Sequence, residues 1–157
     1  SSLLPVIEYI GIDNNQNLLN EGRKRNPSEK FMEGDLLEIP LSDSAVDRTF
    51  CIAALHHIPS LELREKAVKE LKRITKKEGY IIITVWNLWQ KKYWKSIVKA
   101  IFHKYEWNDL FIPWAKKIDR YYHAFTKSEF KKLLKSEFEI VEFFKYSHNF
   151  CAVCKKK

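Results

Sequence analysis

Two aspartates lie at the ends of segments that are predicted to be strands. Asp13 closes the run VIEYIGID at residues 6–13, and a carboxylate at the end of a parallel strand can accept hydrogen bonds from both hydroxyls of a ribose. Gly34 and Asp35 follow a short predicted strand at residues 30–33. Glycine lets the backbone approach a ligand closely, and Asp35 could accept a hydrogen bond from an adenine amino group. Capping of the next helix by Asp13 and an ordinary Gly-Asp turn are the competing interpretations.

A pair of histidines, His56 and His57, follows a third predicted strand at residues 46–54. A metal site is disfavoured because no further ligands stand at a suitable spacing. We expect one histidine to pack beneath the following loop and the other to line the substrate side. By residue type alone, Arg64 on the next predicted helix is typical of an exposed charge.

The run RYYH combines a guanidinium, which can hold a phosphate through two hydrogen bonds, with aromatic faces. This mixture suits a nucleotide that has been taken out of its stack. The predicted substrate-binding residues are therefore Arg120, Tyr121, Tyr122 and His123. A buried aromatic pair flanked by surface charge is the alternative.

Apolar runs and capping residues alternate along the first 86 residues, as strands and helices do in a parallel α/β sheet. The strands are continuous apolar runs, so we expect a sheet that is covered on both faces. The carboxyl ends of such strands share one edge, where the ligand should bind. Strands are predicted at residues 6–13, 30–33, 46–54 and 80–86, and helices at residues 17–25, capped by Asn14, and 61–76, capped by Ser60.

The middle of the chain is rich in tryptophan and lysine. All five tryptophans lie within residues 86–114, interleaved with lysines, and they predict an aromatic, lysine-rich helical insertion at about residues 87–118. This insertion could bind RNA, with bases stacked on the rings and phosphates held by the lysines. It could equally cap the sheet and bury its tryptophans.

The last part of the chain predicts one helix and a hairpin. Thr126 and Glu129 form a capping box that opens a short helix through residue 134. The runs at residues 139–146 and 150–155 predict two antiparallel strands joined by a short turn. The two cysteines of the second strand are three positions apart and point to opposite faces, which disfavours a zinc or redox site.

The composition excludes several classes of protein. A length of 157 residues fits one domain, and a hydrophobic share of 45% excludes a disordered tail. No apolar run reaches the roughly 18 residues of a membrane-spanning helix. Three cysteines make no extracellular disulfide framework, so a reducing, cytoplasmic location is expected. Residues 1–60 carry 5 Lys/Arg and 9 Asp/Glu, whereas residues 61–157 carry 23 and 11, so the basic part could face a polyanion or be a solvated surface.

These features in this order resemble the class I S-adenosylmethionine-dependent methyltransferases over residues 6–86. The resemblance rests on Asp13, on Gly34-Asp35, on the segment AALHHI and on Glu78-Gly79 before an apolar strand. It implies a Rossmann-like three-layer α/β sandwich whose mostly parallel sheet ends in a C-terminal antiparallel hairpin. It also implies S-adenosyl-L-methionine as the cofactor. The cofactor-binding residues that it implies are Asp13, Asn14, Gly34, Asp35, Leu36 and Ala53.

The segments AALHHIPSLELR, IIITVWNLWQ, DRYYHAFT and HNFCAV are similar to the tRNA wobble-uridine methyltransferases over about residues 50–155. Those enzymes methylate the carboxylate of a carboxymethyluridine in the anticodon, and eukaryotic members work with a small zinc-binding activator protein. The resemblance implies tRNA as the partner and His56 and Arg64 as catalytic contacts to it. A carboxylate acceptor is already ionised at neutral pH, so no strong general base is required. A small-molecule methyltransferase of the same fold and a non-catalytic RNA- or partner-binding module are the alternatives.

One part of the family pattern is absent from this sequence, namely the first strand and the Gly-rich D-x-G-x-G-x-G loop. We therefore expect residues 1–157 to form a single, N-terminally truncated methyltransferase domain, which could be inactive on its own. A homologue that has lost cofactor binding is the competing interpretation.

Overall fold

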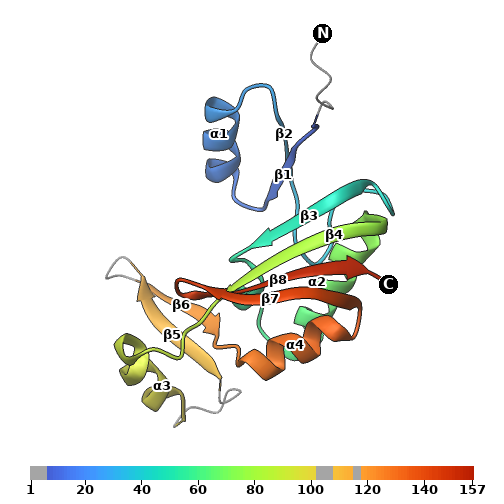
Figure 1. The fold of residues 1–157 in the computed structure, drawn as a ribbon. Coiled ribbons are helices and arrows are strands. Elements are labelled where there is room, and N and C mark those ends of the chain that lie inside the picture. The colour runs from blue at the N-terminus through green and yellow to red at the C-terminus, as the bar shows by residue number, and fades with distance from the viewer. Residues whose placement is uncertain (1–6, 102–107, 115–117) are drawn as a thin grey trace. The chain divides into compact units, whose positions relative to one another are not determined.

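The computed structural model describes residues 7–101, 108–114 and 118–157. It divides the chain into two compact units, Ser1–Leu41 and Ser42–Lys157 (Figure 1). The sequence-based expectation of an α/β fold is confirmed in both units.

The first unit is a strand–helix–strand unit. It contains β1 (Ile10–Asp13), α1 (Gln16–Arg25) and β2 (Lys30–Glu33), and the two strands pair in parallel. The predicted helix cap, Asn14, is wrong by one residue, because the Asn15 side chain accepts hydrogen bonds from the amides of Asn17 and Leu18 at 3.0 and 3.4 Å. The cap fixes the turn that follows the acidic end of β1.

The second unit is built on a mixed sheet of four strands. Its order is β3-β4-β8-β7, with β3 (Val46–Ile52) parallel to β4 (Thr75–Trp86). β7 (Phe138–Tyr146) and β8 (Asn149–Lys156) form the predicted antiparallel hairpin, and β8 also pairs antiparallel with β4. The parallel part of this sheet and its antiparallel edge agree with the predicted topology.

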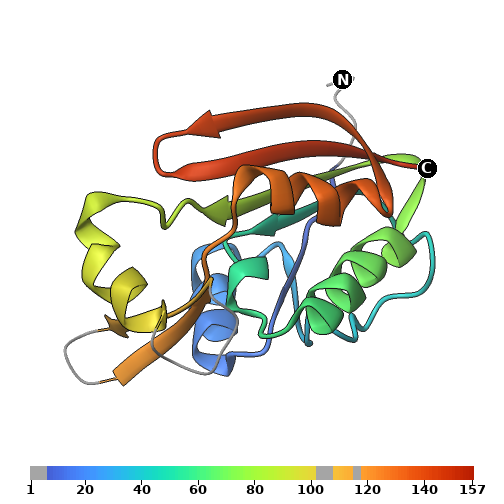
Figure 2. The same ribbon diagram turned by 90° about the horizontal axis from the view of Figure 1, so that it is seen from below.

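Two helices, α2 (Leu61–Ile74) and α4 (Lys127–Lys135), lie on the same face of this sheet (Figure 2). Ser60 caps α2 as predicted, because its hydroxyl accepts a hydrogen bond from the Leu63 amide. The predicted capping box of α4 is also formed. Their apolar sides build the core with β4, and the buried residues include Ala67, Val68, Leu71, Ile81, Ile83, Val85, Phe130 and Leu134.

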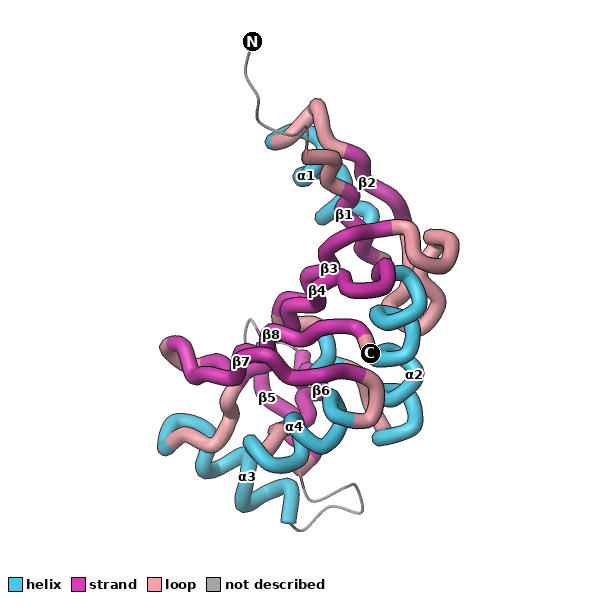
Figure 3. The backbone as a smooth tube through the Cα atoms, turned by 45° about the vertical axis from the view of Figure 1, so that its right-hand side comes forward, coloured by secondary structure: helices cyan, strands magenta, loops and turns pink. Residues whose placement is uncertain are grey.

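The predicted helical insertion is helical only in its first part. A short 3₁₀ helix at Lys91–Tyr93 runs into α3 (Trp94–Ile101), but β5 (Asp109–Trp114) and β6 (Ile118–His123) form a two-stranded antiparallel sheet beside α3 (Figure 3). The prediction of helix over residues 109–114 is therefore wrong. A partner strand nearby in the chain supplies the backbone hydrogen bonds that local composition did not reveal. Among the described residues β5 pairs with β6 alone, and such an edge strand tolerates a proline.

The tryptophans of this segment do not share one environment. Trp89 and Trp94 are 37% and 57% exposed, and Trp86 is half-buried. The prediction for Trp107 and for the side chain of Trp114 falls outside the described residues. Among the described helices, none has the length and apolar character needed to cross a bilayer.

Candidate functional site

The two predicted ligand carboxylates of the first unit lie at the carboxyl end of its parallel strand pair. Asp13 is the last residue of β1, and its main-chain oxygen accepts a hydrogen bond from the Gly34 amide at 3.2 Å, so the two strand ends are adjacent. Asp13 Oδ1 accepts from the Asn15 amide at 2.8 Å, and Asp35 Oδ1 accepts from the Leu37 amide at 2.7 Å. Each carboxylate is thus oriented by a backbone amide, and no described residue donates a hydrogen bond to its second oxygen.

The other predicted cofactor residues of this unit have weaker structural support. A Cβ atom on Gly34 would come within 2.5 Å of Pro40 and 2.8 Å of Ile12, so close packing alone requires glycine there. Asn14 is exposed and Leu36 is half-buried. Their contact with a cofactor stays a prediction.

In the second unit, Ala53 occupies the sharp turn that follows β3. Its φ of 54° is in the left-handed region, which costs a residue with a Cβ atom about 1 kcal/mol or more. Its amide donates to the main-chain oxygen and to the hydroxyl of Thr84, both at 3.1 Å. This anchored turn begins the short 3₁₀ helix Leu55–His57, and it therefore positions the histidine pair.

His56 is fully buried in this unit. Its Nδ1 accepts a hydrogen bond from the Trp86 amide at 3.3 Å, and its ring lies 5.3 and 5.7 Å from the rings of Trp86 and Tyr122. Burial, followed by the neighbouring His57, lowers its pKa to about 3, so the ring is neutral near pH 7. Its Nε2 has no hydrogen-bond partner among the described residues. The structure assigns this ring to the core, and its predicted contact with a substrate stays a prediction.

Arg64 is buried, so its interpretation as an exposed helix charge is wrong. Only 1% of the residue is exposed. Its Nη1 donates to the main-chain oxygen of Ile58 at 3.2 Å and to Tyr121 Oη at 3.5 Å, and the guanidinium lies 5.8 Å from the centre of the Phe125 ring. Arg64 therefore ties the start of α2 to β6, and a direct role in binding substrate stays a prediction.

The predicted substrate residues on β6 fall into two groups. Arg120 is exposed, and Tyr121 is half-buried. Tyr122 and His123 are each 1% exposed, and the Tyr122 ring stacks 5.5 Å from that of Trp86. The alternative interpretation, a buried aromatic pair flanked by surface charge, agrees with Tyr122 and only in part with the half-buried Tyr121. Arg120 is the exposed member of the run.

His123 is the centre of a hydrogen-bond network that the sequence did not reveal. Its Nδ1 lies 2.9 Å from Asp109 Oδ1, and its Nε2 lies 2.6 Å from Glu129 Oε1. Tyr121 donates from its hydroxyl to the same Asp109 oxygen at 2.7 Å. Burial and the Asp109 carboxylate raise the pKa of Tyr121. Burial alone would raise the pKa of the Glu129 carboxyl, but hydrogen bonding and charge from His123 lower it below its ordinary value.

This network joins β5, β6 and the capping box of α4. Asp109 was missed because its partners come together only through the β5–β6 pairing. The one member of the network that the sequence did indicate is Glu129, through the capping box. Its carboxylate accepts a hydrogen bond from the Thr126 amide and lies within hydrogen-bond distance of His123. Within the described residues, no group of three or more His, Cys, Asp or Glu side chains could hold a metal ion.

A family model described as a methyltransferase domain matches residues 2–83. The chain therefore belongs to the methyltransferase domain family. Its alternating strands and helices, with acidic residues at the carboxyl end of β1 and in the loop after β2, are consistent with that family.

The curated relatives of this chain include methyltransferases that act on tRNA. The chain is 31% identical over 127 residues to a methyltransferase of Encephalitozoon cuniculi, an alignment that covers 80% of the chain and 58% of the relative. It is 27% identical over 110 residues to the tRNA (carboxymethyluridine(34)-5-O)-methyltransferase of Saccharomyces cerevisiae, covering 70% and 38%, and 31% identical over 84 residues to that of Arabidopsis thaliana, covering 54% and 20%. The chain thus spans less than two thirds of the length of each of these relatives.

Solved structures share the fold. A SAM-dependent methyltransferase from Methanosarcina mazei superposes with a TM-score of 0.84 at 21% identity, covering 94% of this chain and 81% of that one. A methyltransferase from Haloferax volcanii, solved in complex with the Trm112 methyltransferase activator, gives a TM-score of 0.68 at 12% identity, covering 95% and 72%. At these identities the similarity defines the fold, a Rossmann-like α/β methyltransferase fold.

Proposed function

We propose that this chain is part of a methyltransferase that uses S-adenosyl-L-methionine to methylate the carboxymethyl group of a modified wobble uridine in tRNA. The observation that carries the methyltransferase part is the family match over residues 2–83 together with the oriented carboxylates of Asp13 and Asp35. The tRNA part is supported by the relatives in yeast and Arabidopsis, whose names give that substrate.

The first unit offers the chemistry that the adenosine part of the cofactor needs. Carboxylates accept hydrogen bonds from ribose hydroxyls and from the adenine amino group, and Asp13 and Asp35 each have an oxygen left for that purpose. When bound, S-adenosyl-L-methionine supplies an electrophilic methyl group on a sulfonium. Asn14, Gly34 and Leu36 of this unit are proposed as further contacts, and for Ala53 of the second unit a contact stays a sequence-based prediction.

The residues of the second unit do not need to supply a base. A carboxylate acceptor is ionised at neutral pH, so the chain's task is to position it and to exclude water. His56 is buried and neutral, and Arg64 is buried as well. Their proposed role is to position the residues that surround the acceptor. The exposed Arg120 is the side chain that can reach a phosphate.

Charge supports an RNA partner. Residues 1–41 carry 4 Lys/Arg and 7 Asp/Glu, whereas residues 42–157 carry 24 and 13. A basic surface attracts nucleic acid through its phosphates. The activator-bound structural neighbour from Haloferax volcanii supports a small activator protein as a second partner. A cytoplasmic location stays a prediction.

The test is a methyl-transfer assay on the full-length protein that contains this chain, with and without an activator protein. Labelled S-adenosyl-L-methionine is offered with tRNA carrying 5-carboxymethyluridine and with the same tRNA carrying uridine. We expect label on the carboxymethyl tRNA alone. Transfer only to small acceptors would favour a small-molecule enzyme, and RNA binding without any transfer would favour a non-catalytic module.

A charge-neutral variant tests the cofactor site. Asp13→Asn keeps an oxygen for the Asn15 amide but removes the negative charge, so we expect the cofactor affinity to fall by about tenfold or more while tRNA affinity is unchanged. Asp119→Asn, at an exposed position of β6, is the matched control. Equal cofactor affinity of the two variants would remove Asp13 from the site.

A further inference from the structure

A stretch of the second unit is free of acidic residues. Between Gly79 and Tyr105 the sequence contains no aspartate or glutamate. The same stretch contains three of the five tryptophans and five lysines, Lys91, Lys92, Lys95, Lys99 and Lys104. Such a segment is complementary in charge to a polyanion.

The helix α3 and the turn before it present two different sides. Tyr93 and Ile97 pack against a buried cluster that contains Leu88, Leu110, Tyr122 and Ala124. Trp94 and Val98, each one position further along the chain, are 57% and 43% exposed. Lys91 and Lys95 are exposed as well. An indole is therefore held at the surface with an ammonium group three residues before it and another one residue after it.

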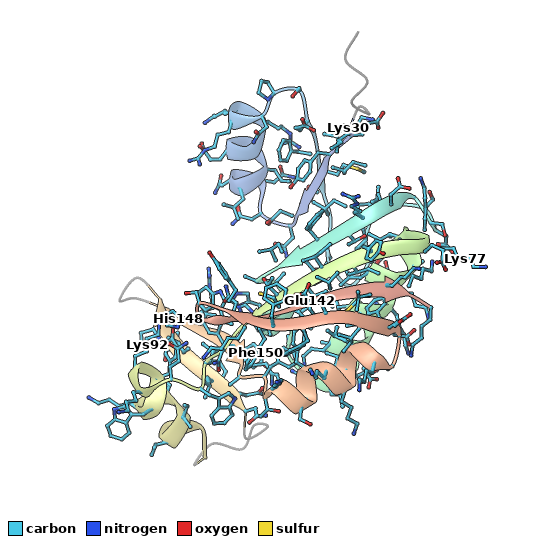
Figure 4. All side chains as sticks on the ribbon, in the orientation of Figure 1. Lys30, Lys77, Lys92, Glu142, His148 and Phe150 are labelled. Atoms are coloured by element: carbon cyan, nitrogen blue, oxygen red, sulfur yellow. The ribbon has the colours of Figure 1, made fainter. Side chains whose placement is uncertain are left out.

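The support beneath this surface is fixed by specific contacts. The Lys92 ammonium lies 4.7 Å from the centre of the Tyr93 ring, and Figure 4 shows Lys92 in the part of the molecule that carries α3, β5 and β6. Trp89 donates from its indole nitrogen to the main-chain oxygen of Ala124 at 3.1 Å. The side that faces the core is thus anchored, which fixes the backbone of the helix that carries Trp94.

We propose that Trp94, flanked by Lys91 and Lys95, is a stacking platform for an unpaired base of a single-stranded RNA segment, with the two lysines on the adjacent phosphates. Stacking on an exposed ring suits any base, because every base has a π face, and the ammonium groups add affinity that depends on salt. This inference deepens the proposed function, on which it rests for the choice of RNA as the partner.

A membrane surface is the competing partner of an exposed tryptophan among lysines. Helices that lie on membranes bury a broad apolar side in the lipid. Here the apolar residues Tyr93 and Ile97 are already used by the protein's own core, and the exposed apolar side chains described on α3 are Trp94 and Val98. The observations therefore favour stacking on single bases.

The test measures RNA binding alone, without S-adenosyl-L-methionine, by fluorescence anisotropy of a labelled 12-nucleotide single-stranded RNA and of the same sequence as a duplex. In the full-length protein, Trp94→Leu should weaken binding of the single strand by about tenfold, because the ring is lost while an apolar side chain stays. Trp94→Phe should keep the affinity within about threefold. Tyr146→Ala, which removes an aromatic ring that is 72% exposed on β7, is the matched control and should change nothing.

The lysines are tested through salt. Lys91→Gln with Lys95→Gln should make the slope of log affinity against log salt concentration less steep by about 0.7 for each phosphate that the protein no longer neutralises. Circular dichroism establishes that each variant is folded.

Several results would overturn the proposal. These are equal effects of Trp94→Leu and Tyr146→Ala, binding of duplex as tight as of single strand, or equal affinity of the leucine and phenylalanine variants. A loss of binding to phosphatidylserine vesicles in Trp94→Leu, with RNA affinity unchanged, would assign the surface to a membrane. If RNA binding depends on Trp94 but the protein transfers no methyl group, the proposed function is contradicted and this inference stands. If the protein methylates the carboxymethyl tRNA but its RNA affinity does not depend on Trp94, the proposed function stands and this inference is overturned.

Discussion

Single polar residues in the interior of the second unit depend on specific partners. Asp109 is 7% exposed, its Oδ1 accepts a hydrogen bond from the Tyr121 hydroxyl, and the same oxygen lies 2.9 Å from His123 Nδ1. Removing the partner of a buried polar group costs far more stability than removing the partner of an exposed one. We therefore expect the network to contribute to the packing of β5, β6 and α4.

Asp109→Ala should lower the free energy of unfolding by about 3 kcal/mol, because it leaves the Tyr121 hydroxyl and the His123 ring without their shared acceptor. Urea denaturation followed by circular dichroism measures this loss. Asp119→Ala, on the exposed side of the same hairpin, should change the unfolding free energy by less than about 0.5 kcal/mol. Similar losses in both variants would show that the network contributes nothing specific.

His56 predicts how stability depends on pH. Burial lowers its pKa from 6.5 to about 3 in the folded protein. Between these values the unfolded chain binds a proton that the folded chain does not, so stability is full above pH 6.5 and falls as the pH decreases. The slope should approach about 1.4 kcal/mol per pH unit for this group.

The measurement compares urea midpoints between pH 7 and pH 5. His56→Gln should flatten the dependence, whereas His148→Gln, in the exposed turn between β7 and β8 (Figure 4), should leave it unchanged. The lowered pKa of His57 leaves a smaller dependence in the His56 variant. An unaltered slope in His56→Gln would contradict the prediction.

Among the secondary-structure elements, α4 is stabilised at its first turn by a capping box. The Thr126 hydroxyl accepts a hydrogen bond from the Glu129 amide at 3.1 Å, and the Glu129 side chain accepts one from the Thr126 amide at 3.3 Å. Thr126→Ala should lower the unfolding free energy by about 1 kcal/mol. Ser128→Ala, exposed on the same helix, is the control, and thermal unfolding of both variants gives the comparison.

Local elements were predictable from sequence, and elements made by distant pairing were not. The strand 30–33, the start of α2 and the capping box of α4 follow from side chains within a few positions of each other. The hairpin of β5 and β6 depends on register between two segments, and so does the meeting of Asp109 with His123. The positions of Asp13 and Asp35 at the carboxyl ends of parallel strands could be predicted without distant information, and their contact with a ligand stays a prediction.

Burial explains the remaining differences at the site. Arg64 and His56 are polar, and their sequence positions resemble those of substrate contacts. Their burial could not be predicted from residue type, because the strand that covers them comes more than 50 residues later in the chain. The covering element is β6: Tyr121 receives a hydrogen bond from Arg64, and the neighbouring Tyr122 covers His56. The sequence pattern therefore did not show which of these side chains are accessible, and their contact with a substrate stays a prediction.

On the scale of the whole molecule, the two compact units differ in charge and in cysteine content. The first unit, residues 1–41, contains more acidic than basic residues and no cysteine, whereas residues 42–157 are strongly basic and contain all three cysteines. Cys51, Cys151 and Cys154 are buried free thiols. Burial raises the pKa of each, to about 12 for Cys51 and Cys154.

These thiols are chemical probes of local unfolding in the second unit, and the first unit has no such probe. A thiolate reacts with iodoacetamide, so buried thiols of raised pKa should be alkylated only when the strands around them open. Mass spectrometry of alkylation over time should therefore report the opening of residues 42–157 alone, with Cys51 on β3 and Cys154 on β8 labelled together if the sheet opens as one cooperative body. Labelling of Cys154 well before Cys51 would instead show that the β7–β8 hairpin detaches first.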